Sequence, residues 1–181
     1  DRTADIGEQY ARRDPRIRVM RLPHGGVSAA RNRGLELAES RYVAFMDCDD
    51  RVDPQYLAAF FRTPLPDGDL LVSQGVAIEY TAQNRTELYD YPDTTGTQGE
   101  LGKIIVENRL LRDGWTYCKL FSLPLIRREA LRFDIGLSIC EDLVFVLGYL
   151  SHVRQIILRS GTYYHYQVCP DGTSLSQRRQ P

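Results

Sequence analysis

The sequence predicts an α/β fold in which a mostly parallel sheet is flanked by helices, and three observations lead to this class. The segments 16–21 and 42–46 have the apolar patterns of strands, and 29–39 between them has the period of a helix. A strand, a Gly-rich turn, a helix and a second strand form a β-α-β unit, in which the two strands are parallel. The second strand ends in three carboxylates, at the kind of sheet edge where open α/β proteins bind ligands.

The remaining elements follow from local patterns. Residues 3–13 predict an amphipathic helix that Asp14-Pro15 ends, and Ser28 is the expected N-cap of the helix 29–39. The polar stretch 81–99 is expected to be a surface loop. Further helices are expected at 54–62, 102–110, 124–130 and 141–150, and further strands at 69–80, 153–158 and 163–168.

The composition is that of one globular domain. The chain has 181 residues, 43% of them hydrophobic and 26% charged, and a formal net charge of −1. This balance gives no reason to expect nucleic acid as a partner, because nucleic-acid binders carry a basic excess. No apolar run reaches the roughly 18 residues of a membrane-spanning helix, and no signal peptide is visible. Four widely spaced cysteines indicate a reducing compartment: Cys48, Cys118, Cys140 and Cys169. We therefore expect a cytoplasmic protein, with peripheral membrane association left open.

The first residues, Asp1-Arg2-Thr3, lead directly into a helical pattern, without an initiator Met or an opening strand. We therefore expect that a strand upstream of Asp1 is missing, and that residues 1–181 are a single domain truncated at its N-terminus.

Three acids directly after the strand 42–46 are candidate metal ligands: Asp47, Asp49 and Asp50. Clustered carboxylates select hard cations such as Mg²⁺ or Mn²⁺, and Mg²⁺ is typically held by one or two carboxylates together with substrate phosphates. The alternative is a solvated acidic turn, because a lone D-x-D is a weak signal.

A second candidate site lies at the start of the helix 29–39. Gly25 and Gly26 precede it, and free N–H groups at a helix start attract anions. Arg31, one turn further, is placed to donate a forked pair of hydrogen bonds to a diphosphate. The alternative is an ordinary turn with Ser28 as a cap.

A third candidate is the acid pair that opens the apolar helix 141–150. Either Glu141 or Asp142 is placed to act as a general base, although the helix dipole alone also favours acids in a first turn. His165 is a further possible contact to metal or phosphate, and Trp115 a possible stacking surface for a sugar ring. Both residues are also readily explained as packed core side chains.

Taken in order, these motifs resemble the family 2 glycosyltransferases, which are inverting enzymes of the GT-A fold that build bacterial polysaccharides. Residues 25–34, GGVSAARNRG, resemble the family's donor segment N-x-G-x-S-x-A-R-N-x-G. Residues 42–50, YVAFMDCDD, resemble its strand and D-x-D-D metal motif, and residues 141–145, EDLVF, its E-D-x-x-F segment. His24 replaces the polar residue usually found at its position.

The resemblance implies roles for these residues. The metal would be Mn²⁺ or Mg²⁺, held by Asp49 and Asp50. Donor contacts would come from five positions: Gly26, Ser28, Arg31, Asn32 and Asp47. Asp142 would be the catalytic base, with Glu141 as its helper or substitute. Residues 1–62 would then form the donor half of the domain, and residues 63–181 the acceptor half with the base.

The implied reaction moves a sugar from a nucleotide-diphosphate sugar, with a UDP-sugar as the first expectation, to a hydroxyl of a saccharide or lipid-linked acceptor. Two alternatives remain. One is a nucleotide-sugar-binding domain without activity. The other is a D-x-D phosphatase, for which Arg51 is a poor fit.

Overall fold

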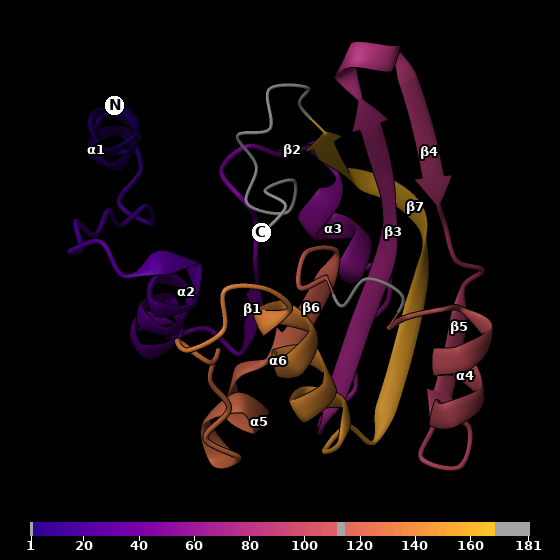
Figure 1. The fold of residues 1–181 in the computed structure, drawn as a ribbon. Helices are drawn as coiled ribbons and strands as arrows, with labels where there is room; N and C mark the ends of the chain where they lie inside the picture. The colour runs from indigo at the N-terminus through magenta and orange to yellow at the C-terminus, as the bar shows by residue number, and fades with distance from the viewer. Residues whose placement is uncertain (1, 112–114, 169–181) are drawn as a thin grey trace.

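The computed structural model describes residues 2–111 and 115–168, and the expectation for Cys169 lies outside them. The described elements form a mixed α/β arrangement with a central sheet (Figure 1). The helices are α1 (Thr3–Arg13), α2 (Gly26–Leu37), α3 (Tyr56–Phe60), α4 (Leu101–Glu107), α5 (Leu123–Arg128) and α6 (Glu141–Leu150). The strands are β1 (Tyr42–Ala44), β2 (Arg51–Val52), β3 (Leu70–Tyr80), β4 (Arg85–Tyr89), β5 (Thr94–Thr97), β6 (Lys119–Ser122) and β7 (Gln155–Val168).

The sheet confirms the α/β class, but the expectation that it is mostly parallel is wrong. Its main path is β1-β6-β3-β7-β2, with β4 beside β3 and β5 beside β7. Only β3 and β7 are parallel among the described pairings, and the other five are antiparallel. The expected β-α-β unit is absent because segment 16–21 pairs with no described strand. The partner of β1 is instead β6, which runs antiparallel to it.

Strand alternation divides the apolar residues between the two faces of the sheet. Leu71, Phe121 and Ile156 point into one cluster with α2, α4, α5 and α6, while Leu70 and Ile157 point into the other with α3. Both cores are therefore built on the same strands. None of the described helices is long and apolar enough to cross a membrane.

Several boundaries differ from the sequence-based expectations. Ser28 is not the N-cap, because α2 begins at Gly26, three residues earlier than expected, and Gly25 is its N-cap. Gly26 takes a φ of +79°, which glycine adopts without strain. The stretch 81–99 is not a loop. It contains β4 and β5, whose polar residues lie on exposed edges of the sheet. The two late strands are one strand, β7, which has an irregularity near Gly161. The polar residues at this irregularity led to the expectation of a break between two strands.

Candidate active site

Arg31 joins the three motifs that are far apart in the sequence. Its Nη2 donates to Asp47 Oδ1 at 2.9 Å, and its Nη1 donates to Glu141 Oε1 at 3.1 Å. The Arg31 side chain is only 12% exposed, and its guanidinium lies 5.3 Å from the centroid of the Phe133 ring. One partly buried cation therefore connects helix α2, the acidic turn after β1 and the first turn of α6. These are the donor segment, the acidic motif and the base segment of the sequence analysis.

Asn32, the next residue of α2, fixes the segment that leads to α6. Its Nδ2 donates to the carbonyl oxygen of Phe133, and its Oδ1 accepts from the N–H of Phe133, both at 2.8 Å. Both ends of the amide are thus used within the fold. The expected contact between Asn32 and a donor stays a prediction.

Replacing Asn32 with Ala removes both bonds and leaves the backbone of Phe133 unpaired, so we expect a loss of about 1–3 kcal/mol of unfolding free energy. Urea denaturation measures it. Asn108→Ala is the matched control, because Asn108, the C-cap of α4, donates from Nδ2 to the carbonyl oxygen of Ile104 one turn earlier and to no distant described segment. A fall in nucleotide affinity with unchanged stability would instead show that Asn32 contacts the donor.

The three acids of the turn after β1 differ in their surroundings. Asp50 is half-buried and uses both oxygens: Oδ2 accepts from the Tyr164 hydroxyl at 2.6 Å and Oδ1 from the N–H of Gln167 at 2.9 Å. Burial raises the pKa of Asp50 above its ordinary value. Asp49 is exposed, and no described residue bonds to its carboxylate. Asp50 therefore anchors the turn to β7, and Asp49 is the acid whose charge remains available.

The available carboxylate suits a divalent cation that is shared with a ligand. No group of three or more His, Cys, Asp or Glu side chains among the described residues could hold a metal by itself. Mg²⁺, however, is usually bound by one or two carboxylates together with phosphate oxygens. Asp49 fits that pattern. Asp50 fits it less well, because both its oxygens already accept hydrogen bonds.

The Tyr164 hydroxyl of β7 is hydrogen bonded to two residues of this turn. It donates to Asp50 and accepts from the N–H of Asp47 at 3.1 Å. Tyr164 was not predicted to be a site residue, because an aromatic residue in a strand is usually a core residue.

Tyr164→Phe removes the donor to a half-buried carboxylate, so we expect a loss of about 1–3 kcal/mol of unfolding free energy, together with weaker metal-dependent nucleotide binding. Tyr117→Phe is the control, because its buried hydroxyl has no hydrogen-bond partner among the described residues and its ring stacks on Tyr164 at 4.7 Å. Equal effects of the two variants on stability and on binding would refute this supporting role.

Glu141 and Asp142 open α6, and the structure separates their surroundings. The Glu141 carboxylate is paired with Arg31 and its side chain is 13% exposed. Asp142 Oδ1 accepts from the N–H of Leu143 at 2.8 Å, and no described cation bonds to its carboxylate. Burial, with a smaller contribution from the negative charge of Glu141, raises the pKa of Asp142. Glu141 is therefore ion-paired within the fold, whereas the carboxylate of Asp142 has no described cation bonded to it, and which of the two is the base stays a prediction.

The start of α2, one turn before Arg31, has an unsatisfied hydroxyl. The Ser28 side chain is buried, and its Oγ has no hydrogen-bond partner among the described residues. Gly26 has no heavy atom within 4 Å of the place where a Cβ would be. Since buried hydroxyls nearly always have a partner, an anionic ligand at this helix start fits Ser28.

The two further candidates lie outside the Arg31 cluster. His165 Nδ1 lies 2.8 Å from Glu79 Oε1, and its Nε2 lies 3.2 Å from Asp53 Oδ2, so two carboxylates already surround its ring. Trp115 stacks on Tyr117 at 5.2 Å, in a row of rings that continues to Tyr164. The proposed contacts of His165 with metal and of Trp115 with sugar stay predictions.

Comparisons with known proteins identify the family and the fold. The model of glycosyl transferase family 2 matches residues 1–132. The putative glycosyltransferase EpsH of Bacillus subtilis (strain 168) is 29% identical over 99% of this chain and 52% of its own length. The minor teichoic acid biosynthesis protein GgaB of the same organism is 31% identical over 98% of this chain and 19% of its own. The crystal structure of S. aureus TarS 1–349 in complex with UDP-GlcNAc matches with a TM-score of 0.77 at 22% identity, and covers 97% of this chain and 48% of that chain.

The chain belongs to glycosyltransferase family 2, and its fold is the GT-A fold of that TarS structure. It spans about half the length of EpsH.

Proposed function

We propose that this domain transfers a sugar from a nucleotide-diphosphate sugar to an acceptor hydroxyl, with inversion at the anomeric carbon. The observation that carries the proposal is the contact of Arg31 with both Asp47 and Glu141. This contact joins α2 to the acidic turn that contains Asp49 and to the first turn of α6, which contains Asp142. We further propose a UDP-sugar as the donor, because the TarS structures were determined with UDP-GlcNAc and with UDP. Membership of family 2 removes the ground for the phosphatase alternative.

The donor would bind with its diphosphate between the start of α2 and the acidic turn. The backbone N–H groups and Ser28 Oγ would bind phosphate oxygens, and Asp49 would hold Mg²⁺ or Mn²⁺. When bound, the cation supplies positive charge to the leaving diphosphate. Arg31 keeps Asp47 in place and neutralises Glu141.

The transfer itself would be a direct displacement. The acceptor oxygen attacks the anomeric carbon while Asp142 takes its proton, and the bond to the nucleoside diphosphate breaks on the opposite face. Attack opposite the leaving group inverts the configuration of the sugar carbon. The acceptor is proposed to be a saccharide or lipid-linked intermediate of a cell-surface polysaccharide, because the relative GgaB is a minor teichoic acid biosynthesis protein. The cytoplasmic location, with or without membrane association, stays a prediction.

The pH dependence of kcat/KM should show the ionisation of Asp142. The base works as a carboxylate, so activity is expected to fall as pH decreases through its pKa, which burial and Glu141 raise above its ordinary value. Glu141→Gln removes the neighbouring negative charge and should move this acidic limb to lower pH. An acidic limb that stays in place would contradict the assignment of Asp142.

A thermal-shift panel on the full-length protein tests the donor. UDP, GDP, CDP and dTDP are each added with and without Mn²⁺. A ligand at about 100 times its Kd stabilises a protein by ~2.7 kcal/mol, so a metal-dependent shift with one nucleotide is expected. No shift with any of them would refute the proposed donor site.

The second candidate function is a domain that binds a nucleotide sugar without transferring it. It predicts the same thermal shift but no release of nucleoside diphosphate in the presence of acceptor. Assaying nucleotide release alongside the thermal shift separates the two candidates.

A further inference from the structure

Glu79, near the end of β3, binds three side chains that come from the strands beside the acidic turn. Its Oε1 accepts from Arg51 Nη2 and lies 2.8 Å from His165 Nδ1, and its Oε2 accepts from Gln167 Nε2 at 2.5 Å. The Glu79 side chain is 20% exposed. Both oxygens of this partly buried carboxylate are therefore in use within the fold.

The strand register explains why these side chains meet. Glu79 of β3 lies opposite Gln167 of β7, and Arg51 of β2 lies opposite His165 of β7. Residues 165 and 167 share one face of β7, because side chains alternate along a strand. β7 lies between β3 and β2 in the sheet (Figure 1). Glu79 therefore reaches across β7 to bind a residue of β2.

Two of the three partners connect Glu79 to the acidic turn. Arg51 directly follows Asp50 and is two residues from Asp49. The backbone N–H of Gln167 donates to Asp50 Oδ1 at 2.9 Å, while the side chain of Gln167 is bound to Glu79. Glu79 therefore acts on the turn through the chain itself and through a hydrogen bond to Asp50.

His165, the third partner, fixes the far end of β2. Its Nε2 lies 3.2 Å from Asp53 Oδ2, and the His165 side chain is 14% exposed. The backbone N–H of Asp53 donates to the carbonyl oxygen of Tyr163 at 2.9 Å. The residues on both sides of the short strand β2 are thus bound to β7.

The surroundings keep Glu79 in its charged form. Burial alone would raise its pKa, but the hydrogen bonds from Gln167, His165 and Arg51 outweigh burial, and the pKa of Glu79 lies below its ordinary value. Hydrogen bonds to a charged acceptor are roughly twice as strong as those between neutral groups. Glu79 is therefore a strong anchor for its partners.

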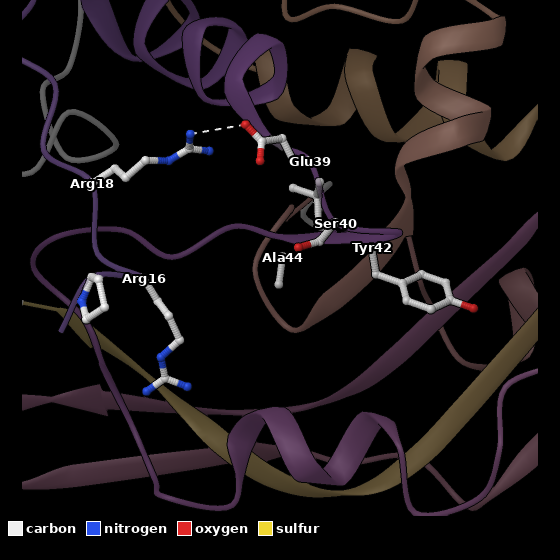
Figure 2. A pocket seen from close by; sticks show the side chains of 9 residues that line it. Arg16, Arg18, Glu39, Ser40, Tyr42 and Ala44 are labelled. Carbon is white, nitrogen blue, oxygen red and sulfur yellow. Dashed lines mark hydrogen bonds and ion pairs between the residues drawn. The ribbon is translucent and has the colours of Figure 1, made fainter.

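The cluster around Glu79 is packed within the fold. The hollow shown in Figure 2 is lined by residues from the segments 15–18 and 38–44, and none of them belongs to this cluster. Tyr164 belongs to the core on the opposite face of β7 and binds the same acidic turn. The turn is therefore held through both faces of β7, by Tyr164 on one and by Glu79 and its partners on the other.

We propose that Glu79 is a positioning residue for the acidic turn, which it holds through Arg51 and Gln167 so that Asp49 is placed to bind the divalent cation. This inference rests on the proposed function, in which Asp49 holds Mg²⁺ or Mn²⁺. Replacing a residue that orients a metal ligand typically lowers metal affinity by about 10–100-fold.

The Mn²⁺ concentration that gives half-maximal UDP binding to the full-length protein tests the proposal. Glu79→Gln keeps the shape of the side chain, but it removes the charge and the acceptor for Gln167 Nε2. We expect the Mn²⁺ requirement to rise by about 10-fold, with UDP binding restored at saturating Mn²⁺. Glu87→Gln is the matched control, because Glu87 of β4 is bound by Arg85 and Tyr89 and should leave the Mn²⁺ requirement unchanged.

A second readout needs neither metal nor nucleotide. In the metal-free protein, the amide of Gln167 that donates to Asp50 should exchange about 10-fold faster in Glu79→Gln than in the unmodified protein. Arg51→Ala removes the direct link to the turn at a side chain that is 55% exposed, and should also raise the Mn²⁺ requirement. Adding it to Glu79→Gln should have little further effect, because the two residues act as a unit.

Two results would overturn the inference. One is a Mn²⁺ requirement and a Gln167 exchange rate that do not change in Glu79→Gln. The other is an equal rise in the Mn²⁺ requirement for Glu79→Gln and Glu87→Gln, which would indicate a general loss of stability. Failure of the unmodified protein to bind UDP with Mn²⁺ would instead refute the proposed function, and needs no variant to be recognised.

Discussion

Asp142→Asn is expected to lower the turnover number by about 10²–10⁴-fold, the usual contribution of a general base. Asn keeps the shape of the side chain and the acceptor for the N–H of Leu143, but it cannot take a proton. Nucleotide affinity should remain unchanged, because Asp142 is assigned to the acceptor and not to the diphosphate. Initial rates and a nucleotide titration on the same preparation measure both.

Two further variants test whether the loss of turnover is specific to Asp142. Glu141→Gln should reduce turnover far less than Asp142→Asn, because Glu141 is bound to Arg31 and acts as a counter-ion. Asp67→Asn, at a side chain that is 93% exposed, is the surface control and should have the turnover of the unmodified protein. If Glu141→Gln proved the more damaging of the two for kcat, the assignment of the base would be reversed.

Arg31→Ala is expected to destabilise the fold by about 3 kcal/mol, because it removes the cation from two partly buried carboxylates, of which the Glu141 side chain is 13% exposed. The variant should also lose nucleotide binding, since Asp47 and the start of α2 are no longer held together. Urea denaturation and nucleotide titration measure these effects.

Two further variants test whether the loss of stability comes from the carboxylates that Arg31 leaves unpaired. Combining Arg31→Ala with Glu141→Gln should recover part of the lost stability, because the uncompensated buried charge is then removed. Arg33→Ala, two positions along the same helix, breaks only an exposed pair with Glu36 and should change little. Equal losses for Arg31→Ala and Arg33→Ala would show that the buried contacts of Arg31 have no special role.

Local patterns predicted the elements that form without distant partners. Helices α1 and α6 have the predicted boundaries, because their apolar spacing and their end signals agree. The paired elements were harder to predict. Segment 16–21 has a strand pattern but pairs with no strand in the part of the chain that the structure describes, while β4 and β5 have loop-like compositions and gain their ladders from β3 and β7. Strand pairing depends on distant residues that no local pattern contains.

The same limit applies to the site. The sequence singled out Arg31, Asp47 and Glu141 in three separate motifs, and the structure joins them through one guanidinium. The sequence could not distinguish Asp49 from Asp50. Only Asp50 is held by hydrogen bonds, and these come from Tyr164 and Gln167, more than a hundred positions away. The sequence likewise could not separate the roles of Glu141 and Asp142, and the pairing of Glu141 with Arg31 is the observation that supports the proposal of Asp142 as the base.

The central claim, that the cluster around Arg31 binds the donor diphosphate with a divalent cation on Asp49, is tested most directly by calorimetric titration of UDP into the full-length protein. We predict binding that requires Mn²⁺ or Mg²⁺ in the unmodified protein and in Asp67→Ala, and that is lost in Asp49→Ala. Binding that is equally tight without metal, or unchanged in Asp49→Ala, would contradict it.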